Sequence, residues 1–214
     1  MENAIRLIGN PLRFGRKSDY PYSVDNLLQK IKDVGLTNFY DQPNDAGTYR
    51  WWTIGGLMEM YQGSNHQTQG LTCYDCHMNT VQKDDGTSFT SHMACGDINI
   101  SEEKLTQCLD CHTSQGIKTT DGMRDLLNEK RAEKDKAVKA AAASLQQLYD
   151  LILAGVQNGD VDAASLDEAR SVYADADCYY QYADGGMVTH DFAEIMVVAQ
   201  KAKTTAENGI ALFK

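Results

Sequence analysis

"CYDCH", at residues 73–77, is repeated as "CLDCH" at residues 108–112. This C-x-x-C-H pattern is the attachment signature of c-type haem. The two thiols add to the two vinyl groups of one porphyrin, and the histidine that follows becomes the proximal ligand of the iron. Two copies with the same aspartate before the second cysteine predict two covalently bound haems c. The predicted attachment and proximal residues are Cys73, Cys76 and His77 for the first haem, and Cys108, Cys111 and His112 for the second.

Two other kinds of site use paired cysteines, a zinc ribbon and a thioredoxin-like redox pair. A zinc ribbon does not need a histidine directly after both pairs. A redox pair would begin a helix after a β-α-β pattern, and no such pattern precedes residue 73. Haem attachment is the interpretation that accounts for both segments.

The composition narrows the class of protein. The 214 residues carry 30 acidic and 20 basic side chains, for a formal net charge of -10. This charge argues against a nucleic-acid-binding protein, which would present a basic surface. No apolar run is long enough for a transmembrane helix. Haem attachment of this type takes place outside the cytoplasm, so we expect a periplasmic or extracellular location. Residues 1–15 do not resemble a secretory signal peptide, so the sequence is either already processed or exported by means that it does not show.

The pattern of apolar residues predicts a mainly α fold with two parts. Residues 1–118 form a haem-packed N-terminal region, which has few periodic apolar residues because porphyrin supplies much of its core. Residues 119–214 form long C-terminal helices that pack on the haems. Within the first region we expect short helices in residues 23–35, capped by Ser23 and ended by a glycine, and in residues 53–63.

The helical region is predicted to contain one long helix and two shorter ones. The long helix covers residues 123–159, and its run "NEKRAEKDK", residues 128–136, is interpreted as a solvated face with i,i+4 charge pairs. "SLDE", residues 165–168, is a capping box that would begin the second helix. The third begins near Thr189 or Asp191 and runs toward residue 208. Apolar residues at alternating three- and four-residue spacing form a seam for another helix: Val138, Ala141, Leu145, Leu148 and Ile152.

Each haem iron has two axial positions, and His77 and His112 fill one on each iron. Three histidines, His66, His92 and His190, remain for two distal positions. Methionine is the alternative distal ligand, but closely packed multihaem proteins tend to use two histidines. An iron with two histidine ligands has no open position, which suits electron transfer rather than substrate binding. One of the three histidines is therefore surplus to the chain.

The stretch "GLTCYDCHMNTVQKDDGTSFTSH", residues 70–92, followed by "CLDCH" and a long helix, resembles the C-terminal part of pentahaem cytochrome c nitrite reductase, an ammonia-forming family. The resemblance extends over residues 12–200. It implies that His190 is the distal ligand of the first haem and His66 that of the second. His92 corresponds to the histidine that binds the second haem of that family. It is therefore a candidate ligand to a haem of another chain. The long helix corresponds to one through which the family forms dimers, so a helix-mediated oligomer is expected.

The chain also departs from that family. The catalytic haem of the family is attached at C-x-x-C-K, and no such motif is present here. The family has a Lys-x-Gln-His stretch that supplies calcium ligands and a catalytic histidine, whereas this chain has "YRWWTIGG" at residues 49–56. We therefore expect no catalytic residues in this chain by itself.

Three functions fit these observations. The favoured one is a dihaem cytochrome for electron transfer, with both irons held by two histidines. The alternative is a subunit of a split nitrite-reductase-like oxidoreductase, whose catalytic haem lies on another chain. The third is a structural assembly in which His92 reaches a haem of a neighbouring copy. In each case the expected partners are other haem proteins or haem-bearing subunits. Cys95 and Cys178 have no role in these schemes, and either form a disulfide between the two regions or remain two unpaired thiols.

Overall fold

The computed structural model describes most of the chain from Ser23 onward. The described residues are 23–37, 44–51, 53, 61, 63–78, 80–90 and 102–214. His92 and Cys95 lie outside them, as does most of the helix expected in residues 53–63. The expectations that rest on these residues therefore stay predictions.

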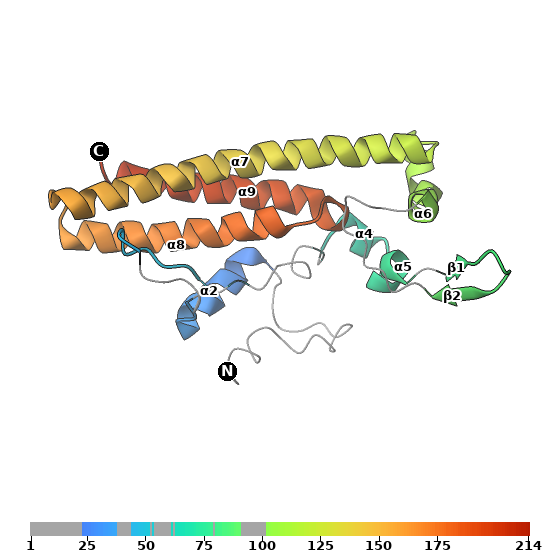
Figure 1. The fold of residues 1–214 in the computed structure, drawn as a ribbon, viewed down its shortest axis with the longest axis horizontal. Coiled ribbons are helices and arrows are strands. Elements are labelled where there is room, and N and C mark those ends of the chain that lie inside the picture. Colours follow the sequence, from blue (N-terminus) through green and yellow to red (C-terminus); the bar gives the residue numbers. More distant parts are fainter. Residues whose placement is uncertain are drawn as a thin grey trace.

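Three long helices form the body of the described structure. They are α7 (Thr120–Asn158), α8 (Ala163–Gly185) and α9 (Val188–Ala211), and they lie side by side along their lengths (Figure 1). The helix α8 runs antiparallel to both neighbours. With 39 residues, α7 is the longest, and its first turns extend beyond the other two helices. The prediction of a mainly α fold with long C-terminal helices is confirmed.

The predicted seam of α7 is buried within the chain itself. Val138, Ala141, Leu145, Leu148 and Ile152 are all buried, and they pack against apolar side chains of α8 and α9. Burial of these side chains, rather than the helix propensity of an isolated segment, accounts for most of the stability of such a helix. The helix ends where Gly159 adopts a left-handed conformation with φ of 68°, as the sequence predicted.

The start of α8 differs from the predicted one, whereas the start of α9 agrees with the prediction. The N-cap of α8 is Asp162, whose carboxylate accepts hydrogen bonds from the backbone N–H groups of Ala164 and Ser165, both at 3.0 Å. The predicted capping box at Ser165 is therefore wrong, because the helix already begins after Asp162 and Ser165 lies within its first turn. In α9 the helical geometry is interrupted at Asp191, whose carboxylate accepts from the N–H of Glu194 at 3.1 Å. Asp191 therefore caps the main part of α9.

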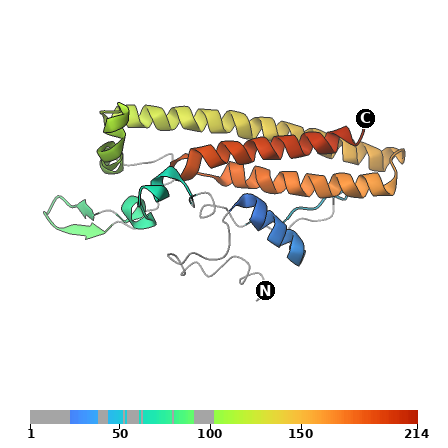
Figure 2. The same ribbon diagram turned by 180° about the vertical axis from the view of Figure 1, so that it is seen from behind.

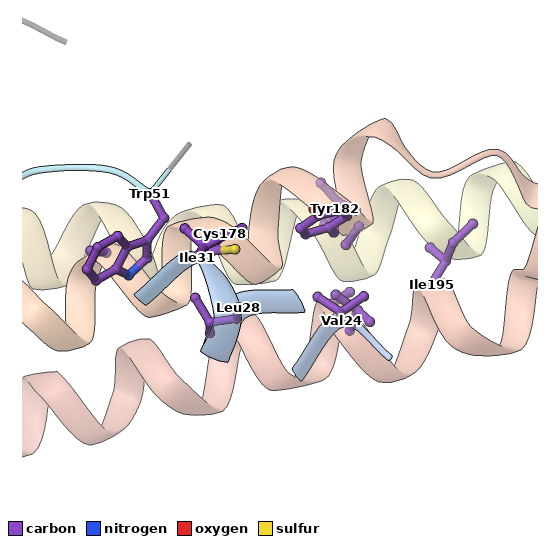
Figure 3. Packing of buried hydrophobic residues seen from close by; sticks show 12 residues of the cluster. Val24, Leu28, Ile31, Trp51, Cys178, Tyr182 and Ile195 are labelled. Carbon is purple, nitrogen blue, oxygen red and sulfur yellow. The ribbon is translucent and has the colours of Figure 1, made fainter. Parts of the chain in front are cut away.

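A short helix from the N-terminal region packs against the bundle. This helix, α2 (Val24–Val34), is capped by Ser23 and ended by Gly35 at φ of 69°, which confirms the prediction. Its apolar side chains meet buried residues of α8 and α9, and Trp51 closes one side of the cluster. Figure 3 shows the packing of Val24, Leu28, Ile31, Trp51, Cys178, Tyr182 and Ile195.

The short elements that carry the cysteine motifs gather at one end of the bundle. They are α4 (Asn65–Thr68), α5 (Cys73–His77), β1 (Thr80–Gln82), β2 (Ser88–Thr90), α6 (Glu102–His112) and the 3-10 turn η2 (Thr113–Gln115). Figure 2 shows them at the end where α7 and α9 begin. The strands β1 and β2 pair antiparallel, with Val81 opposite Phe89. None of the helices in the described residues is long and apolar enough to cross a membrane.

Candidate haem-binding site

The first motif folds as a helix of its own, α5. Asp75 stabilises the start of this helix, because its carboxylate accepts hydrogen bonds from the backbone N–H and the hydroxyl of Thr72, both at 2.6 Å. These bonds lower the pKa of Asp75. Cys73 and Cys76 are three positions apart on the helix, so their thiols share one face, and both residues are exposed. The motif therefore presents two accessible thiols with His77 directly after them.

The second motif lies at the end of a longer helix, α6. Leu105, one turn before Cys108, is fully buried in an apolar cluster with Met123 and Leu127 of α7 and Val188 of α9. Cys108 itself packs against this cluster and is half-buried. The cluster thus fixes the second motif against the beginnings of both α7 and α9.

The structure brings four of the predicted ligands together as two pairs. The ring centroids of His77 and His190 are 6.1 Å apart, with 60° between the ring planes. The ring centroids of His66 and His112 are 6.3 Å apart, with 61° between the planes. Each pair joins a histidine of a C-x-x-C-H motif to a histidine from a distant part of the chain. The remaining candidate, His92, is outside the described residues.

These separations suit two imidazoles that share one metal. A metal–histidine bond is about 2.0–2.1 Å long and the ring centroid lies about 1.2 Å beyond the bound nitrogen, so two histidines on opposite sides of one metal would hold their centroids about 6.4–6.6 Å apart. Both observed separations lie just below that range. Donor type and spacing therefore fit a haem iron between the members of each pair.

The orientation of His66 is fixed by a backbone group. Its Nδ1 lies 3.0 Å from the carbonyl oxygen of Thr189. Since a carbonyl only accepts, Nδ1 carries the proton and donates, and in the neutral ring Nε2 is then the nitrogen with the free lone pair. Histidines that bind metals commonly donate their second ring nitrogen to a carbonyl in this way. His66 is therefore presented in the tautomer that binds a metal through Nε2.

Both motif histidines are held in their neutral form. Burial lowers the pKa of His77, and the positive charge of Lys104 lowers it further. Burial also lowers the pKa of His112, with a smaller contribution from His66 in the same direction and an opposing one from Gln115. A neutral imidazole has the lone pair that a metal requires, whereas an imidazolium does not.

The two motifs lie close enough for their thiols to interact. Burial is the main cause that raises the pKa of Cys108, and the charge of Cys76 is the next. Burial likewise raises the pKa of Cys76, and Asp75 adds to the effect. The side chain of Lys104, on the helix of the second motif, donates a hydrogen bond to the backbone carbonyl of Cys76, so the two motifs lie next to each other.

Comparison with known proteins identifies the family of this chain. The family model described as Cytochrome c552 matches residues 19–214. The chain belongs to the cytochrome c552 family. Among curated proteins, cytochrome c-552 of Haemophilus influenzae is 26% identical over 164 residues, which is 70% of this chain and 27% of that protein. The chain thus spans about a quarter of the length of that relative.

A solved structure shares the fold of this cytochrome c552 family member. It is the cytochrome c nitrite reductase of Desulfovibrio desulfuricans, described as a catalytic subunit with two calcium sites. The match has a TM-score of 0.70 at 18% identity, and it covers 90% of this chain and 42% of that chain. The predicted family resemblance is confirmed, and the protein is a multihaem c-type cytochrome with covalently bound haem c. The number of haems and the ligands of each remain proposals.

The segment that ends at Trp51 is joined to α8 by Arg50 and by Trp51 itself. Arg50 forms an ion pair with the fully buried Asp177 at 3.3 Å. Next to it, the indole N–H of Trp51 donates to Asp175 at 2.8 Å, and Lys32 of α2 pairs with the same carboxylate at 2.6 Å. Two cationic side chains and one indole N–H thus contact two carboxylates of α8, those of Asp175 and Asp177.

Several residues around the site escaped the sequence analysis. Tyr61 donates to the carbonyl of Leu71 at 2.6 Å and sets its ring edge-on to His190, with centroids 5.9 Å apart. Lys130 and Lys134 of α7, which the sequence analysis assigned to a solvated face, reach the segment around His190. Their partners are an aromatic ring and backbone carbonyls far away in sequence, so no local pattern signals these contacts.

Of the two remaining cysteines, Cys178 lies in the helical core, away from the paired histidines. Cys178 is fully buried between α2 and the bundle, and burial raises the pKa of its thiol to about 12. Cys95 lies outside the described residues, so their pairing stays a prediction.

Proposed function

We propose that this chain is an electron-transfer cytochrome that carries two haems c. His77 and His190 would hold the iron of the first haem, and His112 and His66 that of the second. The observation that carries the proposal is the pairing of these four histidines at centroid separations of 6.1 and 6.3 Å. No other histidine is needed to complete either pair.

The chemistry follows from the ligand set. A haem iron held by two histidines cycles between its ferric and ferrous states, and its potential depends on axial ligands, burial and neighbouring charge. The protein contributes rigid ligands: α5 and α6 carry the motif histidines, α4 carries His66, and the start of α9 carries His190. Since both imidazoles of each pair are already committed, this arrangement favours outer-sphere electron transfer over binding of a substrate at iron.

The experiment is a spectroscopic count on the purified native protein. We expect two haems per chain by pyridine haemochrome assay and mass spectrometry, and purely low-spin signals by electron paramagnetic resonance. Reduced protein should not bind carbon monoxide. A substantial high-spin signal, or carbon monoxide binding, would show an open iron position and would refute the proposed ligation.

We propose as a second candidate that this body works as part of a larger nitrite-reductase-like assembly. The likeness to a solved nitrite reductase of longer chain supports it, as does the surplus histidine at position 92. The catalytic haem would then lie on a further haem-bearing part, and the location would be periplasmic, where c-type haems are attached. Native mass spectrometry of the protein from its own host tests this. A native species with only this chain and two haems would refute it.

A further inference from the structure

The turn between α8 and α9 determines the position of a histidine in each pair. His190 lies in the first turn of α9, directly after this turn, and its ring is paired with that of His77. Thr189, directly before it, supplies the carbonyl that accepts the hydrogen bond from His66 at 3.0 Å. Adjacent residues thus set the place of one distal ligand and the tautomer of the other. A group that holds this turn therefore acts on both predicted haem sites.

Lys134 of α7 is such a group. Its Nζ donates hydrogen bonds to the backbone carbonyls of Asp184, at 2.7 Å, and of Gly186, at 2.5 Å. The carbonyls in the last turn of a helix have no partner within that helix. The negative end of the helix dipole also favours a cation at this position. Lys134, from the neighbouring helix α7, thus donates the hydrogen bonds that the backbone at the end of α8 lacks within its own helix.

The contacts around the turn explain why the loss of the Lys134 hydrogen bonds would also move the start of α9. A Cβ atom at Gly186 would lie 2.7 Å from Cγ1 of Ile195, so the turn sits directly against α9. On the far side of His190, Nζ of Lys130 lies 4.9 Å from the ring centroid of Phe192. Two lysines one turn apart on α7 therefore hold the segment on both sides of His190. Lys134 is the one that bonds to the backbone.

We propose that Lys134 is a positioning residue for both distal histidines. By fixing the carbonyls of residues 184 and 186 it fixes the path of the backbone through Thr189 and His190. The Thr189 carbonyl then orients His66, and the side chain of His190 faces His77. This inference rests on the proposed function, because it matters for haem only if His66 and His190 bind iron.

The test compares Lys134→Met with the wild type by electron paramagnetic resonance of the haem-loaded protein. Methionine keeps the aliphatic stem and removes the donor. We expect the low-spin signals of both haems to broaden or shift, and a high-spin fraction to appear, because both distal histidines lose their fixed places. A remote loss of charge alone would change potentials without creating high-spin iron. Unchanged signals, or a change at one haem only, would overturn the proposal.

The matched control is Lys139→Met, an exposed lysine farther along the same helix. It removes the same charge and should leave both signals unchanged. Lys134→Arg retains a cationic donor and should restore most of the wild-type spectrum. If Lys134→Met yields no haem-loaded protein, Lys134→Ala, which also removes the donor and has the highest helix propensity, is measured in its place. The same outcomes then apply.

Failure of this inference can be told apart from failure of the proposed function. The wild-type spectrum alone tests whether each iron has two histidine ligands. If the wild type is low-spin and Lys134→Met is indistinguishable from it, only the role of Lys134 is refuted. If the wild type already contains high-spin iron, the ligation itself is refuted.

Discussion

Nζ of Lys104, on α6, donates a hydrogen bond to the backbone carbonyl of Cys76, the second cysteine of the first motif. A cation from the helix of the second motif thus lies at the end of the helix that carries the first. Burial lowers the pKa of His77, and the positive charge of Lys104 lowers it further. The contact links the two motifs and places a positive charge beside one of the predicted irons.

This contact predicts a selective change in reduction potential. A nearby positive charge disfavours the more positive ferric state and raises the potential. Lys104→Met should therefore lower the potential of the first haem by tens of millivolts in order of magnitude, with a smaller change at the second. A spectroelectrochemical titration that resolves the two haems measures it. Lys104→Arg keeps the charge and should keep the potential, and a fall of equal size in both variants would contradict the electrostatic cause.

Two glycines in the helical region predict opposite effects of the same substitution. At Gly209 a Cβ atom would lie 2.6 Å from Cδ2 of the fully buried Leu148. Gly209→Ala should therefore lower the free energy of unfolding by about 1–3 kcal/mol, as overpacking does. At Gly185 nothing lies within 4 Å of the added atom. Gly185→Ala should be neutral or stabilising by up to about 1 kcal/mol, from helix propensity.

Denaturant unfolding of the two variants, monitored by circular dichroism, measures both glycine effects. The haem content of each preparation must match, because covalently attached haem itself adds stability. Equal destabilisation by both substitutions would show that close packing at Gly209 is not the cause.

Asp175 joins three parts of the chain and should matter more than an exposed aspartate. It accepts from the indole of Trp51 and from Lys32, so α2 and the 44–51 segment both meet α8 there. Asp175→Ala leaves a part-buried indole N–H without its acceptor, which should cost about 1–3 kcal/mol of unfolding free energy. Asp167, whose side chain is 75% exposed beside Arg170, is the control. Asp167→Ala should change the free energy of unfolding by less than about 0.5 kcal/mol.

Local sequence signals predicted much of this fold because its helix ends are made locally. Ser23, Gly35 and Gly159 act within a few residues of themselves, and the apolar seam of α7 is visible as a local three- and four-residue spacing. The start of α8 was misplaced because the chain has two possible N-caps three residues apart, Asp162 and Ser165. The earlier one, Asp162, is the N-cap.

The supporting contacts of the site could not be predicted in the same way. Lys134 stands in a run of alternating charges that is typical of a solvated face, and its partners are carbonyls 50 and 52 positions away. A backbone carbonyl has no sequence signature, so neither this contact nor that of His66 with Thr189 leaves a trace in the sequence. The motifs themselves were visible because haem attachment requires fixed spacing along the chain.

Asp25 predicts how stability changes in acid. The hydrogen bond from Lys201 is the main cause that lowers its pKa, burial opposes the shift, and the Tyr179 hydroxyl, which donates at 2.8 Å, adds to the lowering. A carboxyl whose folded-state pKa is depressed stabilises the fold above its unfolded pKa of about 3.9, and this contribution is lost as the pH falls through the folded-state value. Asp25→Asn should therefore be less stable than wild type near neutral pH, by less than about 1 kcal/mol because the pair is largely exposed. The difference in stability between Asp25→Asn and wild type should vanish below the folded-state pKa of Asp25.

Asp135 is exposed and serves as the control. Asp135→Asn should be as stable as wild type both near neutral pH and in acid. Unfolding curves at a series of pH values measure this, and a gap for Asp25→Asn that widens toward acid would contradict the assigned direction.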